Sequence, residues 1–249
     1  MEYKFPLKKA EENLRRLFDK VQSESDGKVI FNLDVTAGRR AGYNMFCEYG
    51  NVFLENRYTD WGNYYPYQTL RNLWQLSRYV PAERLQVEFL NKYRNVDKYP
   101  QDDIFAPSHY SMPYLFATTM AGQPLAWMEA TGLPEQSYDR LTELIKGYAG
   151  LQHDFHRGII LPVGDEPDGR AWTGFQSIRS DNTGYLLVYR EYCQDSVHVL
   201  QTWLPSNAVI KMEKVLGEGA SESLVDDKGQ VAVTIPQENA FVLFRYSIE

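Results

Sequence analysis

The sequence predicts a protein of two parts, an α/β part with parallel strands up to about residue 158 and an all-β part after it. Before Gly158, amphipathic helical segments alternate with short strand-like runs, the order that produces parallel strands joined by crossover helices. After Gly158, strand-like segments recur about every ten residues with turn signals between them, which is typical of an antiparallel β-sandwich. We therefore expect an α/β domain over residues 1–158 and an antiparallel β-sandwich domain over residues 159–249.

Apolar residues at helical spacing predict the helices of the first part, and two short apolar runs predict its strands. A continuous apolar run is typical of a strand that is buried on both faces. The expected helices contain Leu14 to Val21, Leu70 to Ser77, Leu85 to Tyr93, and Tyr138 to Phe155. The expected parallel strands are Val29–Leu33 and Val52–Leu54, with a third near Tyr114–Met120.

Turn signals such as Asp181-Asn-Thr-Gly184 and Asp227-Lys-Gly229 divide the second part into strands. No helical pattern interrupts them, which favours antiparallel pairing. The expected strands are Trp172–Ile178, Tyr185–Tyr192, Val197–Leu204, Val209–Val215, Val231–Ile235 and Phe241–Tyr246.

Composition excludes several classes of function. The net charge of −7 argues against a nucleic-acid partner, since phosphate binding needs a basic stripe. The apolar runs are too short to span a bilayer, and no Gly-rich phosphate loop or spaced metal-ligand motif occurs. We therefore expect no cofactor and no metal. Residues 1–6 lack the order of a signal peptide, so we expect a soluble protein, with the periplasm and the cytoplasm both open.

Charged and aromatic residues follow both predicted strands at the point where each strand ends. In barrels of alternating strands and helices, chemistry sits at the carboxyl ends of the strands. The alternative is that these residues merely begin loops. The candidates for catalysis are Asp34, Glu55 and Asp60, and those for substrate binding are Arg39, Arg57, Trp61 and Tyr64.

Aromatic residues make up 14% of the chain, with 18 Tyr and 5 Trp, and many lie between Tyr43 and Tyr79. Flat aromatic rings suit the C–H faces of sugars, and Tyr and Trp add a polar edge. The alternative for any single ring is that it packs in a core. Together with paired carboxylates, this composition favours a carbohydrate ligand.

Three segments carry a resemblance to a known family. They are Leu33-Asp34 through Gly38-Arg39, Glu55 through Asp60, and Phe116-Ala-Thr-Thr-Met120 through Trp127. In the order of these segments and in their residue types, the chain resembles the C-terminal half of a melibiase-type glycoside hydrolase, that is, α-galactosidase family 36 and its relatives. Those enzymes carry a (β/α)8 barrel followed by an antiparallel β-sandwich. The resemblance implies that residues 1–158 are the C-terminal part of a (β/α)8-like catalytic domain.

The chain also departs from the family pattern. The family nucleophile lies on a Trp-Asp-bearing strand end several elements upstream, and only one predicted helix precedes Val29–Leu33 here. The family acid lies two residues past the Arg of a Gly-Gly-Gly-Arg-x-Asp loop, so alignment on Arg39 or Arg40 puts Ala41 or Gly42 at that position. We therefore expect a fragment or divergent form that is inactive by itself. The missing half of the barrel would lie upstream or come from another chain, which includes a second copy. A third option is that the N-terminal part folds into something smaller than a barrel.

Three functions remain open. A glycoside hydrolase would use Asp34 and Asp60, with Glu55 in reserve, on a glycoside or oligosaccharide substrate. A noncatalytic carbohydrate-binding protein would use Trp61, Tyr64, Tyr65 and Trp172 as a stacking platform. A structural or interaction module would reuse the fold alone. The strand ends favour a hydrolase for the parent protein, and the lost acid position favours the other two for this chain.

Overall fold

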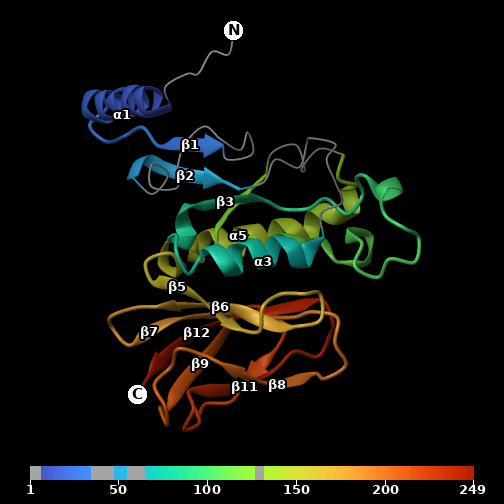
Figure 1. Ribbon diagram of the computed structural model, residues 1–249. Helices are drawn as coiled ribbons and strands as arrows, with labels where there is room; N and C mark the ends of the chain where they lie inside the picture. The colour runs from blue at the N-terminus through green and yellow to red at the C-terminus, as the bar shows by residue number, and fades with distance from the viewer. Residues whose placement is uncertain (1–6, 35–47, 55–64, 127–131) are drawn as a thin grey trace.

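Parallel strands form the first layer of the computed structural model, which describes residues 7–34, 48–54, 65–126 and 132–249 (Figure 1). The strands in those ranges pair in the order β1-β2-β3-β4. Each of these pairings is parallel, as expected before residue 158. The strands are β1 (Phe31–Asp34), β2 (Gly50–Phe53), β3 (Leu85–Glu88) and β4 (Gln123–Leu125).

Strand β3 corrects a helix expected from the sequence. Leu85, Phe89 and Tyr93 have helical spacing, but Leu85–Glu88 is extended and pairs with β2 and β4. Leu85 and Val87 are buried in the main core, so the segment has the period of a strand rather than that of a helix.

A second correction concerns the strand expected near Tyr114–Met120. This stretch forms helix α4 (Met112–Ala117), whose first turn is stabilised by Ser111: its Oγ accepts a hydrogen bond from the Tyr114 N–H at 3.2 Å. Pro113 in that first turn favours a helix start. The strand that does follow is β4, which begins at Gln123.

The remaining helices lie where the sequence predicts them. They are α1 (Leu7–Glu24), α3 (Pro66–Leu76) and α5 (Tyr138–Phe155). Single turns of 3-10 helix occur at Ala82–Arg84, Val96–Lys98, Pro107–His109 and Glu135–Ser137. Helix α1 packs on β1 through Phe18, whose ring centroid lies 4.3 Å from that of Phe31. Within the described residues, no helix is long and apolar enough to cross a membrane.

Antiparallel sheets make up the second part. A five-stranded sheet has the order β5-β6-β7-β12-β9, and a three-stranded sheet has the order β10-β11-β8. The strands are β5 (Ile159–Gly164), β6 (Trp172–Ile178), β7 (Thr183–Arg190), β8 (Val197–Gln201), β9 (Ile210–Gly217), β10 (Ala220–Ser221), β11 (Gln230–Thr234) and β12 (Ala240–Ile248). Strand β5 was not expected from the sequence.

The five-stranded sheet is a middle layer that is buried on both faces (Figure 1). In β12, Phe241 and Leu243 pack in the core shared with the helices, and Val242 and Phe244 pack in the core shared with the three-stranded sheet. The molecule is therefore layered as parallel sheet, helices, five-stranded sheet and three-stranded sheet, with α3, α4 and α5 between the two larger sheets and α1 at the outer end beside β1 (Figure 1).

Candidate functional site

The carboxyl ends of the parallel strands meet at one edge of their sheet. Asp34 is the last residue of β1 and stands opposite Phe53 of β2. Glu88 is the last residue of β3, and its side chain is 0% exposed. A fully buried carboxylate needs partners that offset the loss of water, and such groups are frequent at functional sites. This edge is the candidate functional site.

The two faces of the parallel sheet differ in character. The face that carries Val52, Leu85 and Val87 packs in the same core as helices α3, α4 and α5. On the other face, the side-chain amide of Asn32 in β1 donates a hydrogen bond to Gln86 Oε1 in β3, across strand β2. Helices thus cover the apolar face, while amide side chains line the opposite face.

Glu88 was not predicted from the sequence, since Leu85 to Tyr93 was assigned to a helix. A signal was present. Gln86 and Glu88 alternate with Leu85 and Val87 at the period of a strand, and Phe89 and Leu90 extend the apolar run. The pattern is short, and without the neighbouring strands it is ambiguous.

Most of the residues predicted for the site lie outside the described residues. They are Arg39, Glu55, Arg57, Asp60, Trp61 and Tyr64. Asp34 is described through its backbone, at the predicted end of the first strand. The structure therefore brings the two predicted strands together in parallel, and the mutual arrangement of their candidate side chains stays a prediction.

The predicted stacking platform needs one correction. Trp172 is 4% exposed, and its ring stacks on that of His198 at a centroid distance of 5.5 Å, so it belongs to the core of the antiparallel sheets. Tyr65 fits better, because it is half-buried at the start of α3. Its ring stacks on Tyr67 at 5.5 Å, and its hydroxyl donates a hydrogen bond to Asp103 Oδ2 at 2.6 Å.

Two histidines lie at or just beyond the end of α5, one at the surface and one largely in the interior. His153 is exposed, whereas His156 lies 3.3 Å from the Tyr148 hydroxyl through its Nε2 atom. Burial lowers the pKa of His156 to about 4, so its ring is neutral at pH 7. Among the residues that the structure describes, no cluster of His, Cys, Asp and Glu could hold a metal ion.

Comparison with known proteins gives a likeness of structure only. No family model matches the sequence, and no curated protein sequence matches it. The galactosidase domain of the alpha-galactosidase-sucrose kinase AgaSK superposes with a TM-score of 0.66 at 14% identity. The GH36 alpha-galactosidases AgaB and AgaA from Geobacillus stearothermophilus superpose with TM-scores of 0.61 and 0.63 at 14% and 13% identity.

The matches cover most of this chain but a minor part of the larger proteins. In each of the three, 95% of this chain is aligned with 31% of the matched chain. Identity this low supports conclusions about fold and not about activity. The chain therefore has the fold of a segment, about a third in length, of GH36 alpha-galactosidase structures.

Proposed function

We propose that this chain is a carbohydrate-active protein related to α-galactosidases, in which the parallel strands are the C-terminal part of a (β/α)8 barrel. The edge marked by Asp34 and Glu88 would contact the glycoside. The single observation that carries the proposal is a parallel sheet with carboxylates at its carboxyl edge, within a fold shared with GH36 structures.

The one-sided helix layer supports a partial barrel. Open parallel sheets normally carry helices on both faces, whereas the strands of a barrel carry helices outside and side chains inside. Here the described helices cover the face that carries Leu85 and Val87. The opposite face, which carries Asn32 and Gln86, would point into the barrel. Among the described strands, β1 pairs only with β2 and β4 only with β3, so both edges are available to further strands.

The register supports a pair of cooperating carboxylates. Asp34 stands opposite Phe53, and Phe53 stands opposite Gln86, two residues before Glu88. Residues two apart in a strand share a face, so Asp34 and Glu88 have the same parity in the pleat. Their strands are separated by β2, and Glu88 lies two residues beyond the point opposite Asp34, which puts the two Cα atoms about 12 Å apart. Inverting glycosidases hold their two carboxyl groups roughly 6.5–9.5 Å apart, so Asp34 and Glu88 would serve as such a pair with their side chains directed toward each other.

We expect binding without turnover from this chain alone. Loss of a general acid costs roughly 10²–10⁴ in rate, and Ala41 or Gly42 stands where the family resemblance implies the acid. The purified chain should release no chromophore from an aryl α-galactoside. Galactose should still quench its Trp fluorescence, and Asp34→Asn should weaken that quenching about tenfold by removing a charged acceptor.

The matched control is Asp26→Asn, an equal change at an exposed position that tolerates Asn, since its φ is +54°. It should leave the quenching unchanged. Turnover above background that disappears in both Asp34→Asn and Asp60→Asn would show that the chain is itself a hydrolase. Equal quenching in all variants would show that galactose does not bind at the carboxyl edge of the parallel strands.

A further inference from the structure

A cavity system lies away from the parallel strands, where α5 and the loop before α4 meet the five-stranded sheet. Two adjoining cavities of about 570 and about 800 Å³ share His109 and the turn Gln237–Asn239 as walls. No lining residue in the described part of the chain comes from β1 to β4. We call this system the junction groove, defined by His109, Arg140, Glu143, Tyr192, Asn239 and Phe241. We propose that it binds a neutral saccharide, a proposal that rests on the carbohydrate function proposed above.

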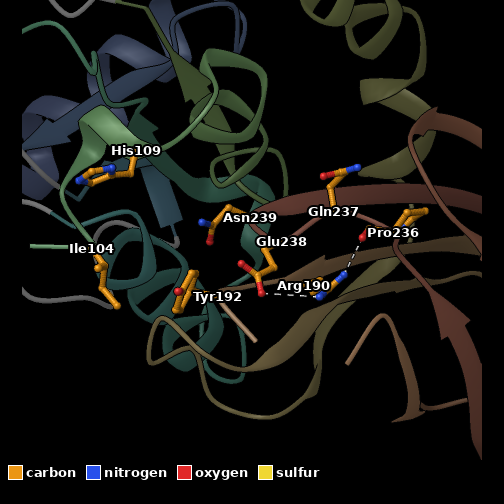
Figure 2. Close-up of a pocket in the computed structure, with 8 residues that line it drawn as sticks. All are labelled: Ile104, His109, Arg190, Tyr192, Pro236, Gln237, Glu238 and Asn239. Atoms are coloured by element: carbon orange, nitrogen blue, oxygen red, sulfur yellow. Dashed lines mark hydrogen bonds and ion pairs between the residues drawn. The ribbon is translucent and has the colours of Figure 1, made fainter. Parts of the chain in front are cut away.

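The turn that forms one wall is held rigidly by Arg190. Its guanidinium is 4% exposed and donates to the carbonyl oxygens of Ile235 at 2.9 Å, Pro236 at 2.8 Å and Cys193 at 2.7 Å. The Glu238 carboxylate lies 3.8 Å from the same group (Figure 2). With its donors used in this way, Arg190 has little left for a ligand. It fixes the turn before a ligand arrives, which reduces the entropy lost on binding.

Asn239 is the residue that this turn presents to the groove. It has a positive φ of +50°, and its carboxamide lies between His109 and Glu238 (Figure 2). Its Oδ1 is buried, and among the described residues it has no hydrogen-bond partner. Buried amide oxygens nearly always accept a hydrogen bond. An amide can accept from one hydroxyl and donate to the next, as a vicinal diol requires.

The surface of the groove suits the two sides of a sugar ring. Its floor contains Tyr114, Leu144 and Phe241, which are buried apolar or aromatic side chains. At its rim, Tyr192 is 41% exposed. An apolar floor with a few polar groups that converge on it is the usual form of a small-molecule site. Aromatic rings pack against the C–H face of a sugar, while hydroxyl groups reach the rim.

The charges of the groove argue against an anionic ligand. The carboxylates of Glu143, Glu218 and Glu238 line it, against the guanidinium groups of Arg140 and Arg190. Arg190 already faces Glu238 and five backbone contacts. A phosphate or carboxylate would therefore meet a slight excess of like charge, whereas a neutral polyol meets none.

The test is calorimetric titration of the full chain with raffinose, using two deletions within the groove. Asn239→Gly keeps the positive φ and removes the carboxamide, and Tyr192→Ala removes the exposed ring. We expect each change to weaken raffinose binding by about fivefold to tenfold, the effect of one hydrogen bond or one ring contact. The matched controls are Asn207→Gly, at a φ of +59° outside the groove, and Tyr79→Ala, at an 84% exposed ring. Both should bind like the unmodified chain.

The double variant Asp34→Asn, Asp60→Asn separates this site from the strand edge. If the double variant still binds raffinose and Asn239→Gly weakens that remaining binding by the same fivefold to tenfold, the junction groove is supported. If the double variant loses all binding, the groove is overturned while the proposed function stands. Glucose, glucosamine and glucose 1-phosphate compare a neutral, a cationic and an anionic ring by ligand-observed NMR. Preference for either charged ring would overturn the neutral class of ligand.

Discussion

At the scale of single residues, the carboxyl group of Glu191 shows how strongly burial acts in this protein. Its Oε2 accepts hydrogen bonds from the N–H groups of Asp168 at 3.1 Å, Gly169 at 2.8 Å and Ala171 at 2.9 Å. Those donors favour the charged form, and burial opposes them more strongly. The result is a pKa raised from 4.5 to about 7. The stability of the turn at residues 168–171 should therefore depend on pH through the ionisation of Glu191.

The direction of that coupling can be tested with Glu191→Gln, which keeps an acceptor for the three N–H groups and removes the ionisation. A carboxyl whose pKa is higher in the folded state stabilises the fold fully below pH 4.5. That contribution is lost as pH rises through about 7. The variant should therefore lose less stability than the unmodified chain between pH 4.5 and 7, by on the order of a few kcal/mol. Urea unfolding across that range measures the difference.

Glu222→Gln is the control for this prediction, since Glu222 is exposed and directly follows β10. Its stability profile should follow that of the unmodified chain. Parallel profiles for Glu191→Gln and the unmodified chain would contradict a raised pKa at Glu191, whatever the absolute stabilities.

At the scale of secondary-structure elements, helix α5 is the connection between the two parts. Phe155 in its last turn is 0% exposed, and its ring centroid lies 5.7 Å from that of Tyr185 in β7. The Phe155 carbonyl also accepts a hydrogen bond from Ser177 Oγ of β6 at 2.6 Å. One turn of helix thus anchors the helical layer to the five-stranded sheet.

We expect Phe155→Ala to destabilise the whole chain by about 3–5 kcal/mol, because the lost ring leaves a cavity that neither layer can fill. Guanidinium unfolding followed by far-UV circular dichroism measures this cost. Tyr138→Ala, at the 46% exposed first residue of the same helix, should cost no more than about 0.5 kcal/mol. Equal costs for the two variants would mean that α5 is not anchored through Phe155.

At the scale of the whole molecule, stability should fall from the antiparallel sheets toward β1. Leu187 in β7 lies in the middle of the five-stranded sheet and is 0% exposed. By contrast, β1 is an edge strand in the described sheet, and Phe31 packs mainly on the small cluster of Phe18 and Tyr49. Fewer buried contacts allow local opening without global unfolding.

Hydrogen exchange tests this gradient. Peptides covering β7 should exchange slower than those covering β1 by a factor on the order of a hundred or more. If the barrel proposal is right, addition of a polypeptide carrying the missing strands should slow exchange in β1 and leave β7 unchanged. Uniform protection across both sheets would instead mean that the four-stranded layer is complete as it stands.

The sequence predicts some secondary-structure elements correctly and others not, and the length of the repeating pattern decides which. Helix α5 was predicted because Leu141, Leu144 and Tyr148 repeat at helical spacing over many turns. Strand β3 was not predicted, because four residues contain too few periods to separate a strand from a helix. For β3 the decision came from β2 and β4, which supply backbone partners on both sides.

The sequence by itself determined the division into an α/β part and an antiparallel part, and the place of Asp34 at a strand end, because these depend on local periodicity and turn chemistry. Only the tertiary structure decided that Glu88 lies at the same edge. Only it brought His109, Arg140, Tyr192 and Asn239 together around one groove. Such residues are far apart along the chain and carry no common local pattern. Their proximity follows from how the layers pack, and side-chain packing is a property of the whole fold.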